Sequence, residues 1–579
     1  MTQSRTSAPE PLAGAPETIA GAVLARAADE SLGLVAGDLR LTHADVVARA
    51  GQRAAWLSAR RSKDGAPFHV AVLLDNVPEF VFWLEACALA GAVLVGANPT
   101  HRGDELVRDL AHTECQFLVT EWAYLPLLEG ARVGTGSSGG DGALGVVTAD
   151  NPRVLVLDST RVQDELQAFT GTGAGSVADP GVTPDTLGYL LFTSGTSGAP
   201  KACLCSQGRL ARIGAIVAQM YALGPNDVCY LSMPLFHSNA LMAGWGPALM
   251  AGSAFALPSG GRFSASGFLP DVRAAGVTYF NYVGKPLSYI LATPERPDDA
   301  DNPLIRAFGN EGSADDVARF AERFGVAVTD SYGSTEGGAT VARTPDTPPG
   351  ALGRAPEGTV VLDPATGAEC PPARFDEHGR LLNAEEAIGE LVSKTGGAGF
   401  EGYWRNDDAE RARLREGWYW TGDLAYRDEA GFFYFAGRDH DWLRVDGENF
   451  ASAPIERILT RHPDVVLAAV YAVPDPAVGD QVMAAVQLRP GVAALDGREL
   501  AAFLDAQGDL GTKWSPRFVR MSDALPITAT NKVVKRALRA ERWNCADPVL
   551  WQPEKGGAYR LMEAGEAAAL EAAVGDRPL

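Results

Sequence analysis

The ten residues 192–201 are the part of the sequence richest in groups that could do chemistry, and they read Phe-Thr-Ser-Gly-Thr-Ser-Gly-Ala-Pro-Lys. Four threonine and serine hydroxyls can donate hydrogen bonds, Gly195 and Gly198 allow close backbone approach, and Lys201 supplies a flexible cation. Hydroxyl and backbone donors gathered in this way form cradles for phosphate oxygens. The stretch therefore predicts a phosphate-binding loop.

Two other interpretations of this stretch fit less well. The P-loop needs a Gly-Lys pair followed by Ser or Thr, whereas Lys201 follows Pro200 and precedes Ala202. A flexible Gly/Ser linker would explain neither the apolar pair at 190–191 before the stretch nor the helical pattern at 208–220 after it.

Strand and helix patterns alternate around the loop and must position it. The apolar run 70–74 precedes a helical pattern at 78–85, and the run 93–95 precedes another at 102–111. Such alternation predicts an α/β fold with layered subdomains and largely buried sheets.

The pattern changes beyond Gly437, where a charged segment is followed by a compact succession of short strands and helices. This change predicts a separate C-terminal domain of about one hundred residues. We expect a large N-terminal domain over 1–437, a small mobile α+β domain over 438–545, and a docked tail over 546–579 that ends in a helix.

Composition narrows the classes of partner and location. Acidic residues outnumber basic ones by 72 to 50, which gives a formal charge of -22 and argues against nucleic acid as a partner. Apolar runs are broken well before the ~18 residues that a membrane span needs, and residues 1–20 lack a signal-peptide pattern. Seven scattered cysteines fit reduced thiols, so we expect a cytoplasmic protein.

The stretch 193–201 and six further motifs, in the family's order, give the chain its resemblance to a known family. The stretch 193–201 resembles the phosphate-loop signature of the adenylate-forming superfamily, which comprises acyl-CoA synthetases, aryl-CoA ligases, the adenylation domains of peptide synthetases, and luciferases. Motifs over roughly residues 40–540 are similar to further segments of that family: Leu41–Asp45, Pro234–His237, Tyr332–Gly337, Tyr419–Asp423, Gly437–Arg438 and Pro526–Lys532.

This resemblance implies an ATP site with Mg²⁺. Tyr332 would offer its ring to adenine, Asp423 would accept hydrogen bonds from the ribose hydroxyls, and Glu336 would bind the metal. The ATP-binding residues implied in this way are Thr193, Ser194, Gly195, Thr196, Ser197, Gly198, Lys201, Tyr332, Gly333, Asp423 and Arg438.

The implied catalytic residues are Lys532, Glu336 and Thr335. A carboxylate must attack the α-phosphorus of ATP, anion against anion, so the site must neutralise and align charge rather than remove a proton. Lys532 would bridge the carboxylate and the α-phosphate, Thr335 would bind the α-phosphate, and Glu336 would hold Mg²⁺. The resemblance also implies rotation of the C-terminal domain about a hinge at His440, where relatives often carry Asp or Lys, and a thiol tunnel that passes Gly447.

Candidate residues for the acid pocket are His237, Tyr282, Lys285 and Gly309. For His237 and Tyr282 a packed core role competes with substrate contact, and Gly309 belongs to a loop that flanks adenine in the family. Lys285 stands where related enzymes commonly carry Glu. It would pair with a second carboxylate or a small anion, or else point into solvent.

The chain most resembles bacterial fatty-acyl-CoA synthetases related to fatty-acid transport proteins, through the segments 282–284, 306–310, 320–325 and 444–449. We therefore predict an AMP-forming acid:CoA ligase that uses ATP, Mg²⁺ and CoA on a fatty or related acid. The alternatives are transfer of the activated group to an amine or carrier protein, activation of a small oxyanion such as nitrite, and a non-catalytic nucleotide- or acyl-binding protein. The oligomeric state stays open, with a homodimer as one option.

Overall fold

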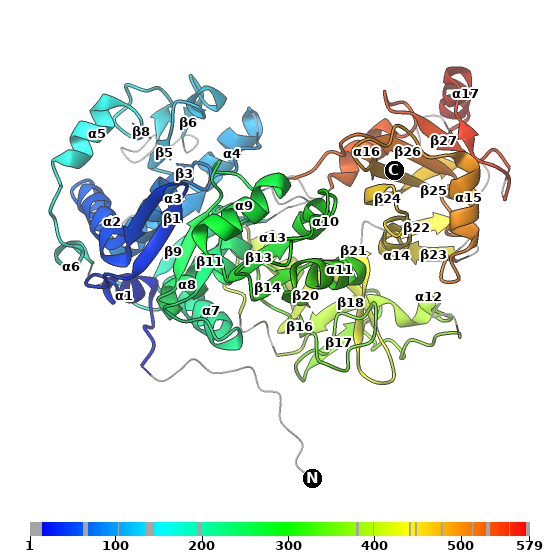
Figure 1. The fold of residues 1–579 in the computed structure, drawn as a ribbon, viewed down its shortest axis with the longest axis horizontal. Coiled ribbons are helices and arrows are strands. Elements are labelled where there is room, and N and C mark those ends of the chain that lie inside the picture. The colour runs from blue at the N-terminus through cyan, green and yellow to red at the C-terminus, as the bar shows by residue number, and fades with distance from the viewer. Residues whose placement is uncertain are drawn as a thin grey trace, which may run out of the picture.

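The computed structural model describes residues 14–574 with gaps at 62–67, 102, 135–143, 180, 194–199, 378–380, 396, 398, 439–441, 446–447, 476–478, 512, 529–532 and 555. Figure 1 shows the N-terminal sheets at one end of the long axis and the C-terminal sheet at the other. The predicted α/β class, with a large N-terminal part and a small C-terminal part, is confirmed.

A mainly parallel six-stranded sheet contains the two strands that flank the predicted phosphate loop. It has the order β10-β9-β4-β3-β5-β8, and only the β9–β10 pair is antiparallel. The strands are β3 (His69–Leu73), β4 (Val93–Gly96), β5 (Phe117–Thr120), β8 (Val154–Val156), β9 (Leu187–Thr193) and β10 (Lys201–Ser206). Its strands are apolar because helices cover both faces.

An eight-stranded sheet carries the segment 332–337. Its order is β16-β15-β14-β13-β11-β12-β1-β2, and β11 to β15 pair in parallel. The strands are β1 (Leu32–Ala36), β2 (Leu39–Thr42), β11 (Val228–Tyr230), β12 (Ala254–Leu257), β13 (Tyr279–Val283), β14 (Arg306–Asn310), β15 (Ala327–Tyr332) and β16 (Val341–Ala342).

The main core lies between these two sheets. Its helices are α1 (Ile19–Leu24), α2 (His43–Ser58), α3 (Pro78–Leu89), α7 (Gln207–Met220), the π-helix η2 (Ala240–Trp245) and α8 (Gly246–Ala251). Pro78 starts α3 at a position where no backbone N–H is needed, and the helix is apolar on all sides because it is buried on all sides. The predicted helix at 208–220 is confirmed as α7.

Other helices cover the outer faces of the two sheets. The eight-stranded sheet is covered by α9 (Ala265–Ala275), α10 (Pro286–Leu291) and α11 (Ala314–Phe324). The six-stranded sheet packs against α4 (Asp104–His112) and η1 (Leu125–Leu127). Smaller elements nearby are α5 (Thr160–Gln167), α6 (Ala174–Val177), and the paired strands β6 (Arg132–Val133) and β7 (Gly145–Val146).

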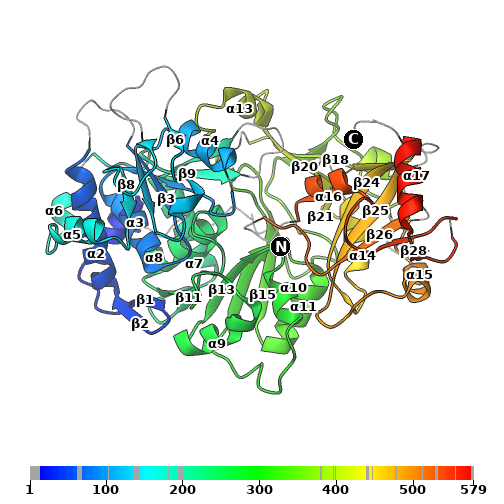
Figure 2. The same cartoon turned by 90° about the horizontal axis from the view of Figure 1, so that it is seen from above.

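A five-stranded sheet follows in the chain and presents the segment 419–423. It contains β17 (Thr359–Leu362), β18 (Gly389–Ser393), β19 (Leu414–Arg415), β20 (Trp418–Arg427) and β21 (Phe433–Arg438), with α12 (Ala384–Ala387) and α13 (Asp407–Arg413) beside it. In Figures 1 and 2, α13 lies between the N-terminal sheets and β20.

The C-terminal part has its own seven-stranded sheet and its own two apolar cores. The elements are β22 (Trp442–Val445), β23 (Glu448–Ala451), α14 (Ser452–Leu459), β24 (Val465–Asp475), β25 (Gly479–Leu488), α15 (Gly497–Asp505), β26 (Phe518–Ser522), α16 (Lys535–Glu541), β27 (Val549–Trp551), β28 (Arg560–Leu561) and α17 (Ala564–Val574). Residues 546–579, expected as a docked tail, contribute β27 and β28 to this sheet. The boundary at 437 stays a prediction.

Among the residues that the structure describes, none of the helices has the length and apolar character needed to cross a membrane.

Glu85 is an unusual member of the main core, because only 1% of its surface is exposed. Burial raises the pKa of its carboxyl to about 8, against an opposing contact with Trp245. A carboxyl with a raised folded-state pKa binds its proton more tightly in the folded protein. Its effect on stability is therefore most favourable below the ordinary value of 4.5 and is lost as the pH rises toward 8.

We expect Glu85→Gln to have a melting temperature that exceeds that of wild type by an increasing margin from pH 5 to pH 8.5. The difference in the free energy of unfolding between Glu85→Gln and wild type should change by at most about 1.4 kcal/mol per pH unit. Thermal unfolding followed across this range tests it, with the exposed Glu322→Gln in α11 as control. Parallel curves for wild type and Glu85→Gln would contradict the assignment.

Candidate active site

The predicted phosphate loop connects two strands that pair with each other. Thr193 ends β9, Lys201 begins β10, and the two residues are antiparallel partners. The predicted residues Ser194, Gly195, Thr196, Ser197 and Gly198 lie outside the described residues. Burial lowers the pKa of the half-buried Lys201, and nearby Arg413 lowers it further while Glu336 opposes this. The β9–β10 pairing thus places the cation of the loop beside the predicted metal ligand.

Glu336 is a buried carboxylate held by a tyrosine. Only 7% of its surface is exposed, and the hydroxyl of Tyr403 donates a hydrogen bond to its Oε1 over 2.8 Å. The guanidinium of Arg413 lies against the same hydroxyl, and Glu336 acts on its charge. Tyr403 and Arg413 therefore join the candidate site in addition to the residues that the motifs predict.

Thr335 is fixed by a side chain and by a buried arginine. Its hydroxyl shares a 2.6 Å hydrogen bond with that of Ser238, and its carbonyl accepts one from Nη2 of Arg209 over 2.6 Å. Arg209 is 1% exposed and also donates to the carbonyl of Leu204 in β10 over 2.9 Å. One guanidinium thereby joins the strand after the phosphate loop to the segment 332–337.

The predicted adenine and ribose residues contact each other. The Tyr332 hydroxyl donates to Oδ2 of Asp423 over 2.6 Å, which joins the end of β15 to β20. Arg438 in β21 is the antiparallel backbone partner of Asp423. At Gly333 a Cβ atom would meet no other atom within 4 Å, so the chain leaves space there.

Side chains of β13 alternate between the two faces of the eight-stranded sheet. Tyr279 packs in the main core, toward η2, whereas Tyr282 packs in the core formed with α9 to α11. The Tyr282 hydroxyl donates to Asp330 over 2.9 Å. A Cβ at Gly309 would lie 2.4 Å from the Tyr282 ring. This placement gives Tyr282 a packed role and makes Gly309 the residue that accommodates its ring.

The Tyr282 contact extends to the loop that follows β14. Asp330 also accepts a hydrogen bond from the backbone N–H of Gly312 over 2.8 Å. Burial raises the pKa of Asp330 to about 7, while the Gly312 and Tyr282 donors oppose the rise. Tyr282 and Asp330 therefore fix the loop 309–312 that was predicted to flank adenine.

The opposite face of the same sheet carries a chain of asparagines. Nδ2 of Asn281 donates to Asn239 over 2.6 Å, and Nδ2 of Asn310 donates to the carbonyl of Ser331 over 2.7 Å. A longer contact of 3.4 Å joins Asn239 to Asn310. Because Asn239 immediately precedes η2, these bonds tie the segment containing His237 to β13, β14 and β15.

The remaining predicted residues are placed less fully. His237 is half-buried beside Asn239, whose backbone N–H approaches its Nδ1 at 3.3 Å. Lys285 is half-buried at the N-terminus of α10. Lys532, His440 and Gly447 lie outside the described residues, although a bridge between Ile527 and Val533 brings together the two ends of the lysine segment.

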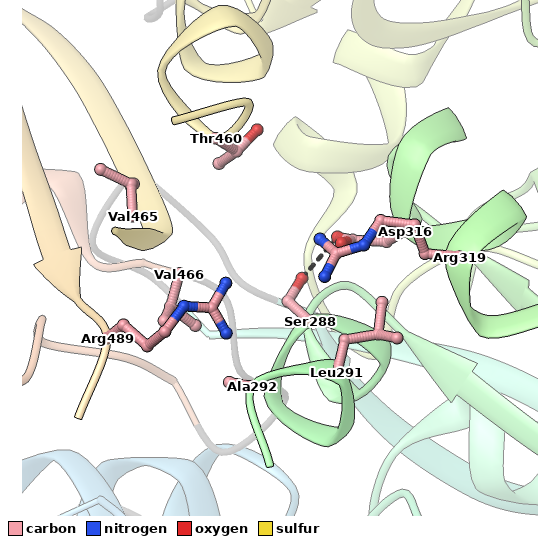
Figure 3. A pocket seen from close by; sticks show the side chains of 9 residues that line it. All are labelled: Ser288, Leu291, Ala292, Asp316, Arg319, Thr460, Val465, Val466 and Arg489. Atoms are coloured by element: carbon pink, nitrogen blue, oxygen red, sulfur yellow. Dashed lines mark hydrogen bonds between the residues drawn. The ribbon is translucent and has the colours of Figure 1, made fainter. Parts of the chain in front are cut away.

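A groove lies elsewhere, between α10 and α11 on one side and the C-terminal part on the other (Figure 3). Ser288 donates to Asp316 over 2.6 Å within it, and Arg319 and Arg489 approach from opposite sides. It contains none of the predicted site residues. Its full lining is Ser288, Leu291, Ala292, Asp316, Arg319, Thr460, Val465, Val466 and Arg489.

Two family models match the chain, and together they span most of it. Residues 24–404 match the AMP-binding enzyme family, and residues 454–532 match the AMP-binding enzyme C-terminal domain. The chain belongs to the AMP-binding enzyme family. The predicted adenylate-forming resemblance is thus confirmed, and so is the predicted class of AMP-forming acid:CoA ligase.

Two similar proteins illustrate the relationship. Steroid-22-oyl-CoA synthetase of Rhodococcus jostii is 50% identical over 556 residues, which is 96% of each chain. The medium/long-chain-fatty-acid–CoA ligase FadD17 of Mycobacterium tuberculosis is 48% identical over 505 residues, 86% of this chain and 92% of the relative.

Solved structures agree in fold. An ATP-bound RpMatB-BxBclM chimera has a TM-score of 0.74 at 25% identity, covering 91% of this chain and 99% of the other. The anthranilate CoA ligase AuaEII in complex with anthranoyl-AMP has a TM-score of 0.74 at 21% identity, covering 90% and 96%.

We expect Arg209→Met to lower kcat by about tenfold or more, because hydrogen bonds to charged groups contribute roughly 1.5–3 kcal/mol. The substitution removes the donor that holds the Thr335 carbonyl. Steady-state kinetics of the folded variant test this, and the exposed Arg212→Met on the next turn of α7 is the matched control. Equal kinetics for the two variants would contradict the role of Arg209.

Proposed function

We propose that this acid:CoA ligase activates a steroid that carries a carboxylated side chain, as an acyl-adenylate, and then transfers the acyl group to CoA. The observation that carries the substrate class is the 50% identity to a steroid-22-oyl-CoA synthetase over 96% of both chains. The adenylation step is supported by the grouping of Lys201, Glu336 and the Tyr332–Asp423 pair in one site.

ATP would lie across the ends of β9 and β15 and the middle of β20. Tyr332 and Asp423 would hold the adenosine, and Thr335 would donate to the α-phosphate. The hydroxyl and backbone donors of 193–198, with Lys201, would bind the β- and γ-phosphates. Arg438, the partner of Asp423 in β21, would donate to the ribose.

Glu336 suits a magnesium ion. Mg²⁺ takes one or two carboxylates together with phosphate oxygens, and Glu336 is a buried carboxylate to whose Oε2 no described residue forms a hydrogen bond. When bound there, Mg²⁺ would neutralise charge on the phosphates. Tyr403 would keep the carboxylate oriented through its bond to Oε1.

The reaction would run in two steps. In the first, an oxygen of the acid attacks the α-phosphorus, the bond to the β-phosphate oxygen breaks and pyrophosphate leaves. Lys532 would lie between the two reacting anions and lower their repulsion. In the second, rotation about His440 would bring Gly447 to the pantetheine arm, and the thiolate of CoA would attack the acyl carbonyl and release AMP.

A medium- or long-chain fatty acid is the second candidate substrate. It is favoured by 48% identity to three fatty-acid–CoA ligases, although over a smaller share of this chain, 83–86%. Steroid acids and fatty acids are both large and apolar, so identity to relatives leaves both as candidate substrates.

The cytoplasm is the proposed location, supported by seven free cysteines, five of them buried.

Acid-dependent ATP–pyrophosphate exchange without CoA tests this proposal. We expect exchange with C22 steroid acids to exceed that with fatty acids of any chain length, and thioester to form once CoA is added. Fatty acids exceeding steroid acids would move the assignment to the second candidate. Exchange with nitrite alone would contradict both.

Lys532→Ala should lower the rate of exchange at least about a hundredfold. It removes the cation that we place between the acid carboxylate and the α-phosphate. Arg536→Ala is the matched control, since Arg536 is an exposed cation four residues further along. Retained exchange in Lys532→Ala would contradict the role given to the lysine.

A further inference from the structure

Arg413, the last residue of α13, is less exposed than the two arginines nearest to it in the sequence. Arg411 and Arg415 are exposed, whereas Arg413 is half-buried. Its Nη1 lies 3.4 Å from the carbonyl of Trp420 in β20, at the edge of a hydrogen bond. In Figure 2, α13 lies at the upper edge of the molecule, between the labels of β9 and β20.

The lack of a side chain at Gly422 leaves room for the Arg413 guanidinium. A Cβ at Gly422 would lie 2.2 Å from Nη1 of Arg413, so no other residue at 422 would fit without moving the arginine. Gly422 directly precedes Asp423, the proposed ribose residue. The guanidinium therefore lies over the backbone next to the nucleotide site and not on the outer surface of the helix.

Arg413 and Lys201 lie close enough to affect each other's surroundings, since Arg413 lowers the pKa of Lys201. Within the described residues, neither cation lies within ion-pair distance of a carboxylate. Glu336 is the carboxylate that both cations face, and its Oε1 is bound by Tyr403. Two cations that both interact with Glu336 favour a further anion, such as a phosphate, between them.

We infer that Arg413 is a phosphate-binding residue that contacts the β- and γ-phosphates of ATP and the pyrophosphate that leaves. This inference rests on the proposed ATP site. A guanidinium can donate two parallel hydrogen bonds to phosphate oxygens, and it keeps its charge at every physiological pH. AMP lacks the β- and γ-phosphates, so Arg413 stabilises ATP and pyrophosphate but contributes little to AMP binding.

Nucleotide binding to Arg413→Gln tests the inference. We expect affinity for ATP and for pyrophosphate to fall by about 10- to 100-fold, as for the loss of charge-assisted hydrogen bonds, while affinity for AMP changes less than about twofold. Arg413→Lys should lose less than Arg413→Gln because it keeps the charge. Arg411→Gln, two residues earlier on the exposed side of α13, is the matched control and should bind all three ligands like wild type.

Two results would overturn the inference. Equal losses for AMP and ATP in the folded Arg413→Gln or Arg413→Lys variants would mean that Arg413 only positions β20. Unchanged ATP affinity in both would mean that it does not touch the phosphates. Wild-type protein that binds ATP but shows no acid-dependent exchange would contradict the proposed function and leave the Arg413 comparison intact, so the two failures are distinguishable.

Discussion

Repulsion between two anions is the constraint on which this site depends. A carboxylate must reach the α-phosphorus of a polyphosphate inside a chain whose own formal charge is -22. The protein as a whole cannot supply the necessary positive potential, so cations must be concentrated locally. Lys201 and Arg413 both interact with the carboxylate of Glu336, and the burial that lowers the pKa of Lys201 also strengthens every charge interaction around it. The remaining cation, Lys532, is assigned to the small C-terminal part, where rotation could withdraw it after adenylation.

Three separate sheets must meet to bring the residues of the candidate site together. The β9–β10 pair brings Lys201, β15 brings Tyr332, and β20 brings Asp423. Arg209 connects the first two from a fully buried position, because its Nη1 donates to the carbonyl of Leu204 and its Nη2 donates to that of Thr335. Tyr403 performs a similar task for Glu336. The site is therefore held by hydrogen bonds between segments that lie 67 to 126 residues apart in the sequence.

The sequence was informative where short motifs state their chemistry, as in the hydroxyl- and glycine-rich loop, Thr335-Glu336 and Thr421-Gly422-Asp423. It was silent on Arg413, whose neighbours Arg411 and Arg415 look identical in one dimension, and on Arg209, because only the fold reveals which arginine points inward. Tyr282 was ambiguous because β13 is buried on both faces. Without polar and apolar alternation, the side of the sheet on which a residue lies cannot be read. The fold class and strand–helix alternation were predictable because hydrophobic periodicity is local.

The most direct test of the account follows the oxygen that forms the adenylate. A C22 steroid acid labelled with oxygen-18 in its carboxylate is incubated with ATP, Mg²⁺, CoA and enzyme, and the nucleotide product is analysed by mass spectrometry. Attack of the carboxylate on the α-phosphorus, followed by thioester formation, predicts AMP that carries one labelled oxygen. Unlabelled AMP, or label recovered in inorganic phosphate, would contradict the acyl-adenylate route.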